Sequence, residues 1–210
     1  MNDEYRKTVH LAVYDQLADW QIGHVTAHLR NGQWQPRPGR FDVVTVGLTG
    51  APVTTMGGMT VLPDITLPQL KPSTSAMLVL PGSSWWDQEP EYLAPFGSAA
   101  GIFLDAGVPV AAICGATAGL AREGLLDHRD HTSTAPEYLL ATGYSGTGRH
   151  RDALTVVDDG LITAGPTAHL EFARAVFSEL GVYPPRVLDA WYRLHAEHDP
   201  DAYYALLEGA

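Results

Sequence analysis

The sequence has little cysteine: Cys114 is the only one among its 210 residues. One thiol forms neither an internal disulfide nor a cysteine-rich zinc site, so a disulfide-stapled scaffold and a zinc finger are both excluded. A single candidate thiol nucleophile is left. A reduced free thiol suits the cytoplasm, and we expect the protein to be cytoplasmic.

Basic residues are also scarce. The chain has 13 Lys and Arg against 24 Asp and Glu, which gives a formal net charge of -11. An acidic surface repels phosphate backbones and anionic lipid headgroups, so we expect neither a nucleic-acid nor a membrane partner. The partner we expect instead is a small-molecule substrate or an oxidant.

Long hydrophobic runs are missing as well. No apolar stretch approaches the length of about 20 residues that a membrane span needs. Residues 1–8 are polar and charged, unlike the apolar core of a signal peptide. The sequence also has no P-loop and no dinucleotide-binding glycine fingerprint, and we expect no cofactor.

Short apolar runs do alternate with helical patterns along the chain. The runs that predict strands are 9–14, 41–47, 76–80, 108–113, 154–157 and 161–164, and a small hairpin is predicted over 53–54 and 59–62 around Gly57-Gly58. The predicted helices are 18–30, 91–106, 117–123, 168–180 and a C-terminal helical extension over about 184–208. This alternation predicts one α/β domain over residues 1–210, with a doubly wound, mostly parallel sheet and helices on both faces.

Cys114 lies between a predicted strand and a predicted helix. Gly115, Ala116 and Ala118 are small enough for a sharp turn and for close packing of helix on strand, as in a nucleophile elbow. The unpaired N–H groups and positive dipole end of that helix favour a thiolate. The alternative is a buried structural cysteine. Sites in doubly wound sheets lie beyond the carboxyl ends of strands, so we expect the loops after Tyr14, Leu80 and Ile113 to form this one.

Several segments together resemble the ThiJ/PfpI superfamily. They are residues 13–20 (VYDQLADW), 78–82 (LVLPG), 112–121 (AICGATAGLA), 124–127 (GLLD) with 131–133 (HTS), and 160–166 (GLITAGP) with 170–173 (LEFA). The similarity spans roughly residues 9–181. It implies the class I glutamine amidotransferase-like, flavodoxin-like fold and suggests a homodimer.

The resemblance also implies roles for individual residues. Cys114 matches the reactive cysteine, and Gly115 matches the residue whose N–H helps to form an oxyanion pocket. Gly82 or Ser83 would offer the second donor of that pocket.

Two positions depart from the family pattern. Gln21 lies where many members have a Glu or Asp, with Asp19 two residues earlier. Glutamine forms hydrogen bonds but takes no proton at neutral pH. Gly115 lies where protease-like members have a histidine, so that catalytic pair is absent.

Histidines elsewhere in the chain are the remaining candidate bases. His131 and His128 lie in the loop after the elbow helix, which we expect to return near the site, although Thr134 aligns better with the family's histidine. The alternative for His131 is a surface position.

His169 and Glu171 have the spacing of an amidotransferase triad. We favour a helix-surface His169 and a partly buried Glu171, because residues two apart on a helix face different directions and Leu170 replaces the usual proline.

His24 and His28 are spaced as metal ligands on a helix can be, but the sequence shows no third ligand beside them. His195 and His198 flank Glu197 near the C-terminus. We favour solvated helix faces for both pairs and expect no metal.

Trp85 and Trp86 follow the Pro-Gly loop. They could line a pocket, form a dimer contact, or pack the loop on the next helix.

The sequence leaves different classes of function open. One is a cysteine-dependent hydrolase, amidase or aldehyde-processing enzyme acting on a small metabolite. Another is a redox- or stress-responsive protein whose cysteine is oxidised or modified without turnover. A glutamine amidotransferase in the strict sense would need Cys114, His169 and Glu171 together, and usually a synthetase partner domain.

Overall fold

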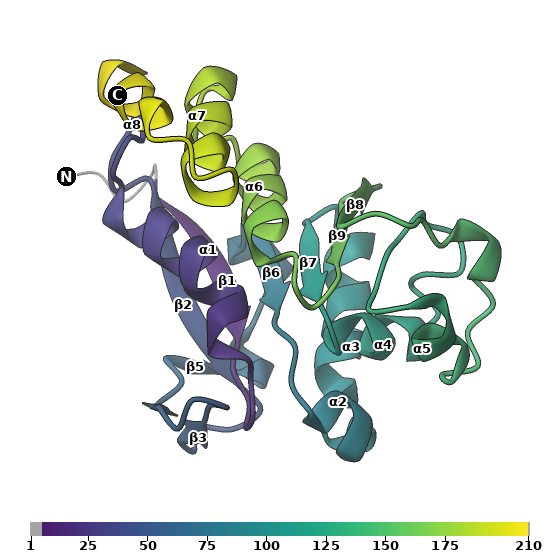
Figure 1. Ribbon diagram of the computed structural model, residues 1–210. Coiled ribbons are helices and arrows are strands. Elements are labelled where there is room, and N and C mark those ends of the chain that lie inside the picture. The colour runs from purple at the N-terminus through teal and green to yellow at the C-terminus, as the bar shows by residue number, and fades with distance from the viewer. Residues whose placement is uncertain (1–5, 210) are drawn as a thin grey trace.

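A seven-stranded sheet forms the centre of the computed structural model, which describes residues 6–209 (Figure 1). The strand order is β5-β2-β1-β6-β7-β9-β8. The strands are β1 (Lys7–Ala12), β2 (Phe41–Gly47), β5 (Ile65–Thr66), β6 (Met77–Leu80), β7 (Val110–Ile113), β8 (Thr155–Asp158) and β9 (Leu161–Ala164). Neighbouring strands are parallel except β8 and β9, which form an antiparallel pair.

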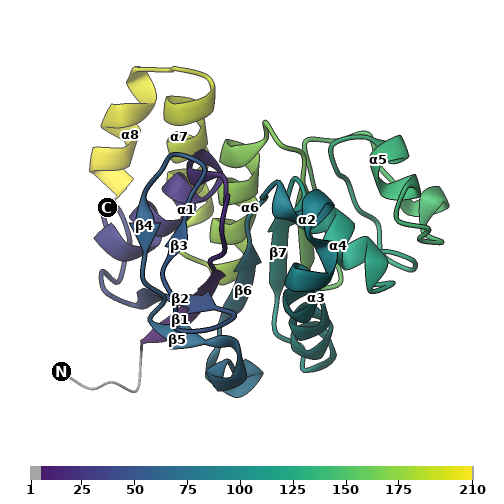
Figure 2. The ribbon, with the colours of Figure 1, turned by 90° about the horizontal axis from the view of Figure 1, so that it is seen from below.

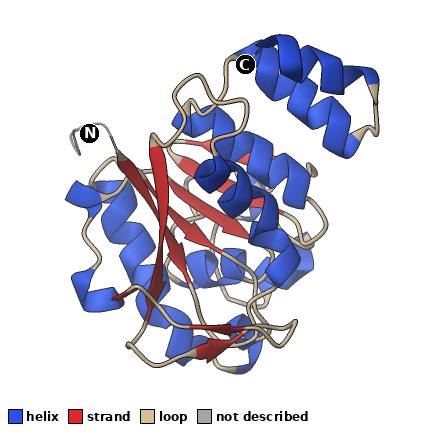
Figure 3. Ribbon diagram, turned by 90° about the vertical axis from the view of Figure 1, so that its left-hand side faces the viewer, coloured by secondary structure: helices blue, strands red, loops and turns tan. Residues whose placement is uncertain are grey.

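Helices cover both faces of this sheet (Figure 3). They are α1 (Asp19–Asn31), α2 (Trp85–Gln88), α3 (Pro90–Asp105), α4 (Ala116–Arg122), α5 (Pro136–Leu140), α6 (His169–Leu180), α7 (Pro185–Ala196) and α8 (Asp201–Gly209). Helix α1 packs against α6, and α3 packs against α4. The predicted α/β, flavodoxin-like fold with a mostly parallel sheet is confirmed.

The continuous apolar runs are explained by burial on both faces. Every residue of β6, β7 and β9 is buried. Large side chains from the two helical layers cover them, among them Phe96 and Phe103 of α3 and Phe172 and Phe177 of α6. The one polar side chain on these three strands, Thr163, accepts the N–H of Thr132 at 2.9 Å.

The C-terminal extension consists of two helices rather than one continuous stretch. α7 packs on both α6 and α8, on the side of the molecule opposite α5 (Figure 2). His198 lies between α7 and α8 and has a left-handed backbone with a φ of 57°. This conformation ends α7. Asp199 then pairs with Arg193 and accepts the N–H of Asp201 at 3.0 Å at the start of α8.

A small hairpin, β3 (Val53–Thr54) with β4 (Thr60–Val61), lies beside the loop that follows β1. The Gln16 N–H donates to the Thr54 carbonyl at 2.8 Å, and the Met56 N–H donates to the Leu17 carbonyl at 2.9 Å. These bonds fix the loop between β1 and α1. Within residues 6–209, no helix has the length and apolar character needed to cross a membrane.

Candidate active site

Cys114 occupies a strained turn between β7 and α4. Its φ is 58°, in the left-handed region that a side-chain-bearing residue rarely adopts. The Cys114 N–H donates to the Ala164 carbonyl of β9 at 2.9 Å. The Cys114 carbonyl accepts the N–H of Thr117 at 3.0 Å and its hydroxyl at 2.6 Å. This backbone is that of a nucleophile elbow, and the residue is half-buried.

Three loops meet around Gly82, at the carboxyl ends of β1, β6 and β7. A Cβ atom placed on Gly82 would lie 2.7 Å from Gln21 Oε1, 2.8 Å from Cys114 Cβ and 3.2 Å from Cys114 Sγ. Only a glycine fits there without a shift of its neighbours. These are the loops that the sequence predicts to form the site, because the carboxyl ends of parallel strands share one edge of a sheet.

Gln21 is buried, and its amide is held by the Pro-Gly loop. Gln21 Oε1 accepts the Gly82 N–H at 2.8 Å. This bond assigns the amide orientation, because only the oxygen accepts an N–H. The Gly82 N–H is therefore already bonded rather than free for an oxyanion, and the Nε2 hydrogens of Gln21 are not used in this bond.

Ser83 and Gly115 provide the remaining donors. Among residues 6–209, no acceptor bonds the N–H of either residue. The Ser83 hydroxyl is occupied, because it donates to the Asp15 carbonyl at 2.8 Å and accepts the Trp85 N–H at 3.0 Å. A Cβ on Gly115 would lie 3.0 Å from the Ser83 carbonyl oxygen and 3.3 Å from Trp86 Cβ. A histidine at position 115 would therefore press on this loop.

The two carboxylates of the first loop hold the hairpin rather than the thiol. Asp19 Oδ2 accepts the Gly57 N–H at 2.6 Å, and Asp15 Oδ1 accepts the Thr54 N–H at 2.8 Å. Burial acts to raise the pKa of Asp19, but hydrogen bonds from the Thr55 side chain and the Gly57 N–H together outweigh it and lower the pKa. Asp19 is thus an ionised side chain whose described hydrogen bonds hold the hairpin and do not involve the thiol.

His131 is fully buried, and both its ring nitrogens have partners. Nδ1 lies 2.8 Å from the Arg129 carbonyl oxygen, and Nε2 lies 3.2 Å from the Tyr144 hydroxyl. Burial lowers the pKa of His131. The loop does return to the elbow, but through Ser133, whose hydroxyl lies 2.6 Å from that of Thr117.

His169 and Glu171 also bond elsewhere. His169 Nδ1 lies 3.2 Å from the Thr167 carbonyl oxygen, and the ring stacks on His24 with centroids 5.9 Å apart. Glu171 accepts the Tyr192 hydroxyl at 2.7 Å. The two side chains thus contact α1 and α7 respectively and make no bond with each other within residues 6–209, as the helical spacing predicts.

Two tyrosines that the sequence analysis did not single out lie near the thiol. The Tyr14 hydroxyl donates to the Pro81 carbonyl and accepts the Trp86 indole N–H at 3.1 Å. The Tyr138 hydroxyl donates to Asp87 Oδ1 at 2.8 Å. Burial raises the pKa of both, and a negative charge on Cys114 acts in the same direction. Both hydroxyls therefore stay protonated. Tyr14 is the last residue of the predicted strand 9–14, and its position beside an expected site loop was the available signal.

The two tryptophans are packing residues. Trp86 is 1% exposed and lies edge-on to Tyr14. A Cβ on Gly119 would lie only 2.2 Å from the Trp86 ring, so α4 passes against the face of this indole. Trp85 packs on Tyr92 of α3 with centroids 5.3 Å apart, which is the packing alternative that the sequence left open.

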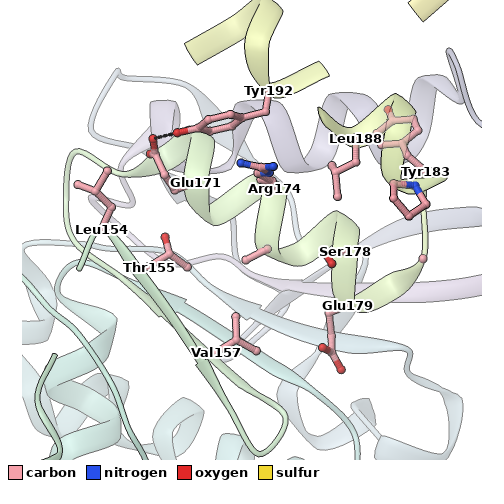
Figure 4. A pocket seen from close by; sticks show the side chains of 13 residues that line it. Leu154, Thr155, Val157, Glu171, Arg174, Ser178, Glu179, Tyr183, Leu188 and Tyr192 are labelled. Carbon is pink, nitrogen blue, oxygen red and sulfur yellow. Dashed lines mark hydrogen bonds between the residues drawn. The ribbon is translucent and has the colours of Figure 1, made fainter. Parts of the chain in front are cut away.

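A separate open groove of about 920 Å³ lies between β8, α6 and α7 (Figure 4). Three of its polar side chains contact one another: Glu171 accepts the Tyr192 hydroxyl, and the Arg174 guanidinium lies over the Tyr192 ring at 4.3 Å. The hydrogen bond to Glu171 and burial raise the pKa of Tyr192 to about 12. The groove contains no thiol or imidazole among its lining residues, so the candidate chemistry remains at Cys114.

A cysteine elbow at the end of a central strand, in a flavodoxin-like sheet, defines the class of protein. The sequence model of the DJ-1/PfpI family matches residues 7–179, and the chain belongs to this family. The resemblance to the ThiJ/PfpI superfamily is thereby confirmed. The match ends before α7 begins.

Individual relatives agree with this assignment. The uncharacterized protease YoaZ of Bacillus subtilis (strain 168) is 34% identical over 204 residues, which cover 96% of each chain. A thiJ/pfpI family protein from Bacillus anthracis is 35% identical, with a TM-score of 0.91 and 97% of each chain covered. The DJ-1 superfamily protein Atu0886 from Agrobacterium tumefaciens is 31% identical, with a TM-score of 0.78, and covers 92% of this chain and 100% of its own.

Proposed function

We propose that this DJ-1/PfpI protein is a cytoplasmic redox- or stress-responsive protein whose Cys114 is modified by an oxidant without catalytic turnover. One observation carries the proposal: Gln21, rather than a carboxylic acid, lies beside Cys114, and its Oε1 holds the Gly82 N–H at 2.8 Å. The nearby carboxylates and the candidate histidines bond to other partners. The N–H groups of Gly115 and Ser83 have no acceptor at this turn, and no base bonds to Cys114 in the part of the chain described.

The chemistry needs only the thiolate and a peroxide. The sulfur attacks one peroxide oxygen, so that an S–O bond forms, the O–O bond breaks and hydroxide leaves. The sulfur is oxidised by two electrons to a sulfenic acid, and the peroxide is reduced. The Nε2 hydrogens of Gln21 and the N–H groups of Gly115 and Ser83 are donors for the new oxygen.

Peroxide treatment followed by intact-mass spectrometry tests the proposal. We expect Cys114 to gain about 16 Da and to become reactive toward dimedone, whereas Cys114→Ser gains neither. We expect the folded chain to react about tenfold faster than the urea-unfolded chain, because only the folded turn holds the N–H donors of Gly115 and Ser83 in place. Equal rates in the two states would overturn the proposal.

Gln21→Glu is a second variant that tests the proposal. A glutamate keeps the oxygen that accepts the Gly82 N–H but loses the two amide donors. We expect the sulfenic acid to be lost or over-oxidised about tenfold faster in this variant, because a hydrogen bond to the oxidised sulfur is missing. An unchanged lifetime would show that Gln21 has no part in holding the oxidised state.

A cysteine-dependent hydrolase, amidase or aldehyde-processing enzyme is the second candidate. The free N–H groups of Gly115 and Ser83 favour it, since two such donors suit a developing oxyanion. A panel of small amides, esters and aldehydes tests it. Turnover that Cys114→Ser abolishes and Gln21→Glu increases would favour this candidate over oxidation without turnover.

Assembly is part of the same proposal. We propose a homodimer on the basis of the family resemblance, and light scattering would then give twice the 22.7 kDa of one chain. A glutamine amidotransferase in the strict sense is not supported, because Glu171 is bonded to Tyr192 and not to His169.

A further inference from the structure

Three histidines from two helices gather at one point, and none of them belongs to the groups that bond around Cys114. His24 and His28 lie one turn apart on α1, and His195 lies in the last turn of α7. One ring nitrogen from each lies within 4.8 Å of the other two. The sequence offered only the α1 pair as ligands, and the fold supplies the third from 167 positions beyond His28.

His195 is oriented as a metal ligand is. Its Nδ1 lies 2.8 Å from the Trp191 carbonyl oxygen. Because a carbonyl only accepts, Nδ1 carries the hydrogen and the lone pair is left on Nε2. A backbone carbonyl in this position is a common outer partner of zinc-bound histidines, because it fixes both the tautomer and the ring orientation.

One ring nitrogen of His28, Nε2, carries no proton because it accepts a hydrogen bond. The Trp191 indole N–H donates to His28 Nε2 at 3.1 Å, while Nδ1 lies 3.4 Å from the Tyr183 hydroxyl. A metal at Nε2 takes over the lone pair that now accepts the indole N–H.

We propose that His24, His28 and His195 bind one zinc ion, with a fourth position open to water or a small ligand. Three imidazoles without a carboxylate suit zinc and other late divalent transition metals rather than magnesium or calcium. Zinc–nitrogen bonds of about 2.0–2.1 Å bring ligand atoms to about 3.4 Å from one another, so the rings move inward from their present spacing. Such an ion would connect α7 to α1. Helix α7 lies beyond the residues that match the family model.

His169 is the matched control for this cluster. Its ring stacks on His24 with centroids 5.9 Å apart, but its nitrogens do not belong to the group of three. His169→Ala therefore removes a neighbouring imidazole and leaves the proposed ligands in place. Cys114→Ser removes the one thiol, a zinc-binding group that lies outside the cluster of three histidines.

Zinc titration of the metal-stripped full chain by calorimetry tests the proposal. We expect one zinc ion per chain with micromolar or tighter affinity, weakened at least about tenfold in His195→Ala and in His24→Ala. His169→Ala and Cys114→Ser are expected to stay within about threefold of the wild type. Absence of stoichiometric binding, or binding that survives His195→Ala, would overturn the proposal.

Thermal unfolding gives a second readout that separates lost ligation from lost folding. Zinc at about 100 times its Kd should raise the Tm of the wild type by about 5–10 °C. His195→Ala should unfold cooperatively in the presence of chelator and show no such rise on addition of zinc. A rise equal to that of the wild type would contradict the assignment of His195 as a ligand.

Discussion

Gly82 is the residue on which the geometry around the thiol depends most directly. A Cβ there would lie 2.7 Å from Gln21 Oε1 and 2.8 Å from Cys114 Cβ. We expect Gly82→Ala to lower the free energy of unfolding by about 1–3 kcal/mol, as overpacking does, and to slow modification of Cys114. Urea denaturation and the peroxide assay measure the two effects.

Gly23→Ala is the control for that substitution. Gly23 is exposed on α1, and a Cβ there meets no atom within 4 Å. An alanine in a helix interior is favoured over glycine, so we expect a gain of about 0.5–1 kcal/mol in stability and an unchanged rate at Cys114. A Gly82→Ala variant as stable as this control would contradict the close approach of the three loops.

The left-handed backbone of Cys114 lowers the free energy of unfolding by an amount that can be measured. Cys114→Gly and Cys114→Ala both remove the sulfur, but only glycine adopts a φ of 58° without strain. We expect the glycine variant to be more stable than the alanine variant by about 1 kcal/mol in urea denaturation. If alanine were the more stable of the two, the elbow would not be strained.

At the scale of elements, α4 is positioned by Trp86. A Cβ on Gly119 would lie 2.2 Å from the buried indole. Because Trp86 also donates to Tyr14 and has no room to move, we expect Gly119→Ala to destabilise the fold by about 3 kcal/mol. Thermal unfolding measures this loss. Gly101→Ala on α3 is the control, since its Cβ would make only an ordinary contact at 3.5 Å with Leu125.

The long elements were predictable from the sequence because burial on both faces leaves an unbroken apolar run. β2 was predicted at its observed bounds, Phe41–Gly47. Three short elements were missed: β5 has two residues, α2 has four and α5 has five, too few for any period to show. The equally short β3 and β4 were predicted, because the Gly57-Gly58 turn marks their hairpin. The first strand was placed too far along the chain, since β1 ends at Ala12 although Val13 and Tyr14 are also buried.

The candidate site was predictable in outline for a topological reason. Gln21, Gly82 and Cys114 follow strands whose carboxyl ends share one edge, so the order of elements brings them together. The histidines could not be placed in this way. Pairing His28 with His195 requires the packing of α7 beside α1, which depends on the three-dimensional fit of Trp191 and not on local spacing.

At the scale of the whole molecule, buried histidines make the fold sensitive to acid. His10 on β1 is 5% exposed, its Nδ1 lies 2.7 Å from the Ser75 hydroxyl, and burial lowers its pKa. Below pH 6.5 the unfolded chain therefore takes up a proton before the folded chain does, and stability falls as the pH falls toward the folded pKa. The slope from this one group is at most about 1.4 kcal/mol per pH unit.

Urea denaturation between pH 5 and pH 8 checks this expectation. His10→Gln removes the titrating ring, so its stability should decline less steeply below pH 6.5 than that of the wild type. His131, whose pKa burial also lowers, is present in both proteins and cancels from the comparison. Parallel curves for the two proteins would show that His10 does not contribute.

The contact between Trp191 and His28 spans 163 positions of the chain, and this separation has a consequence during synthesis. At about 5–20 residues per second, a ribosome takes about 10–30 s to travel from one residue to the other. For that interval the side of α1 that carries His28 has emerged but its covering helix has not been made. The nascent chain therefore presents this imidazole-bearing surface to the cell before the mature protein covers it.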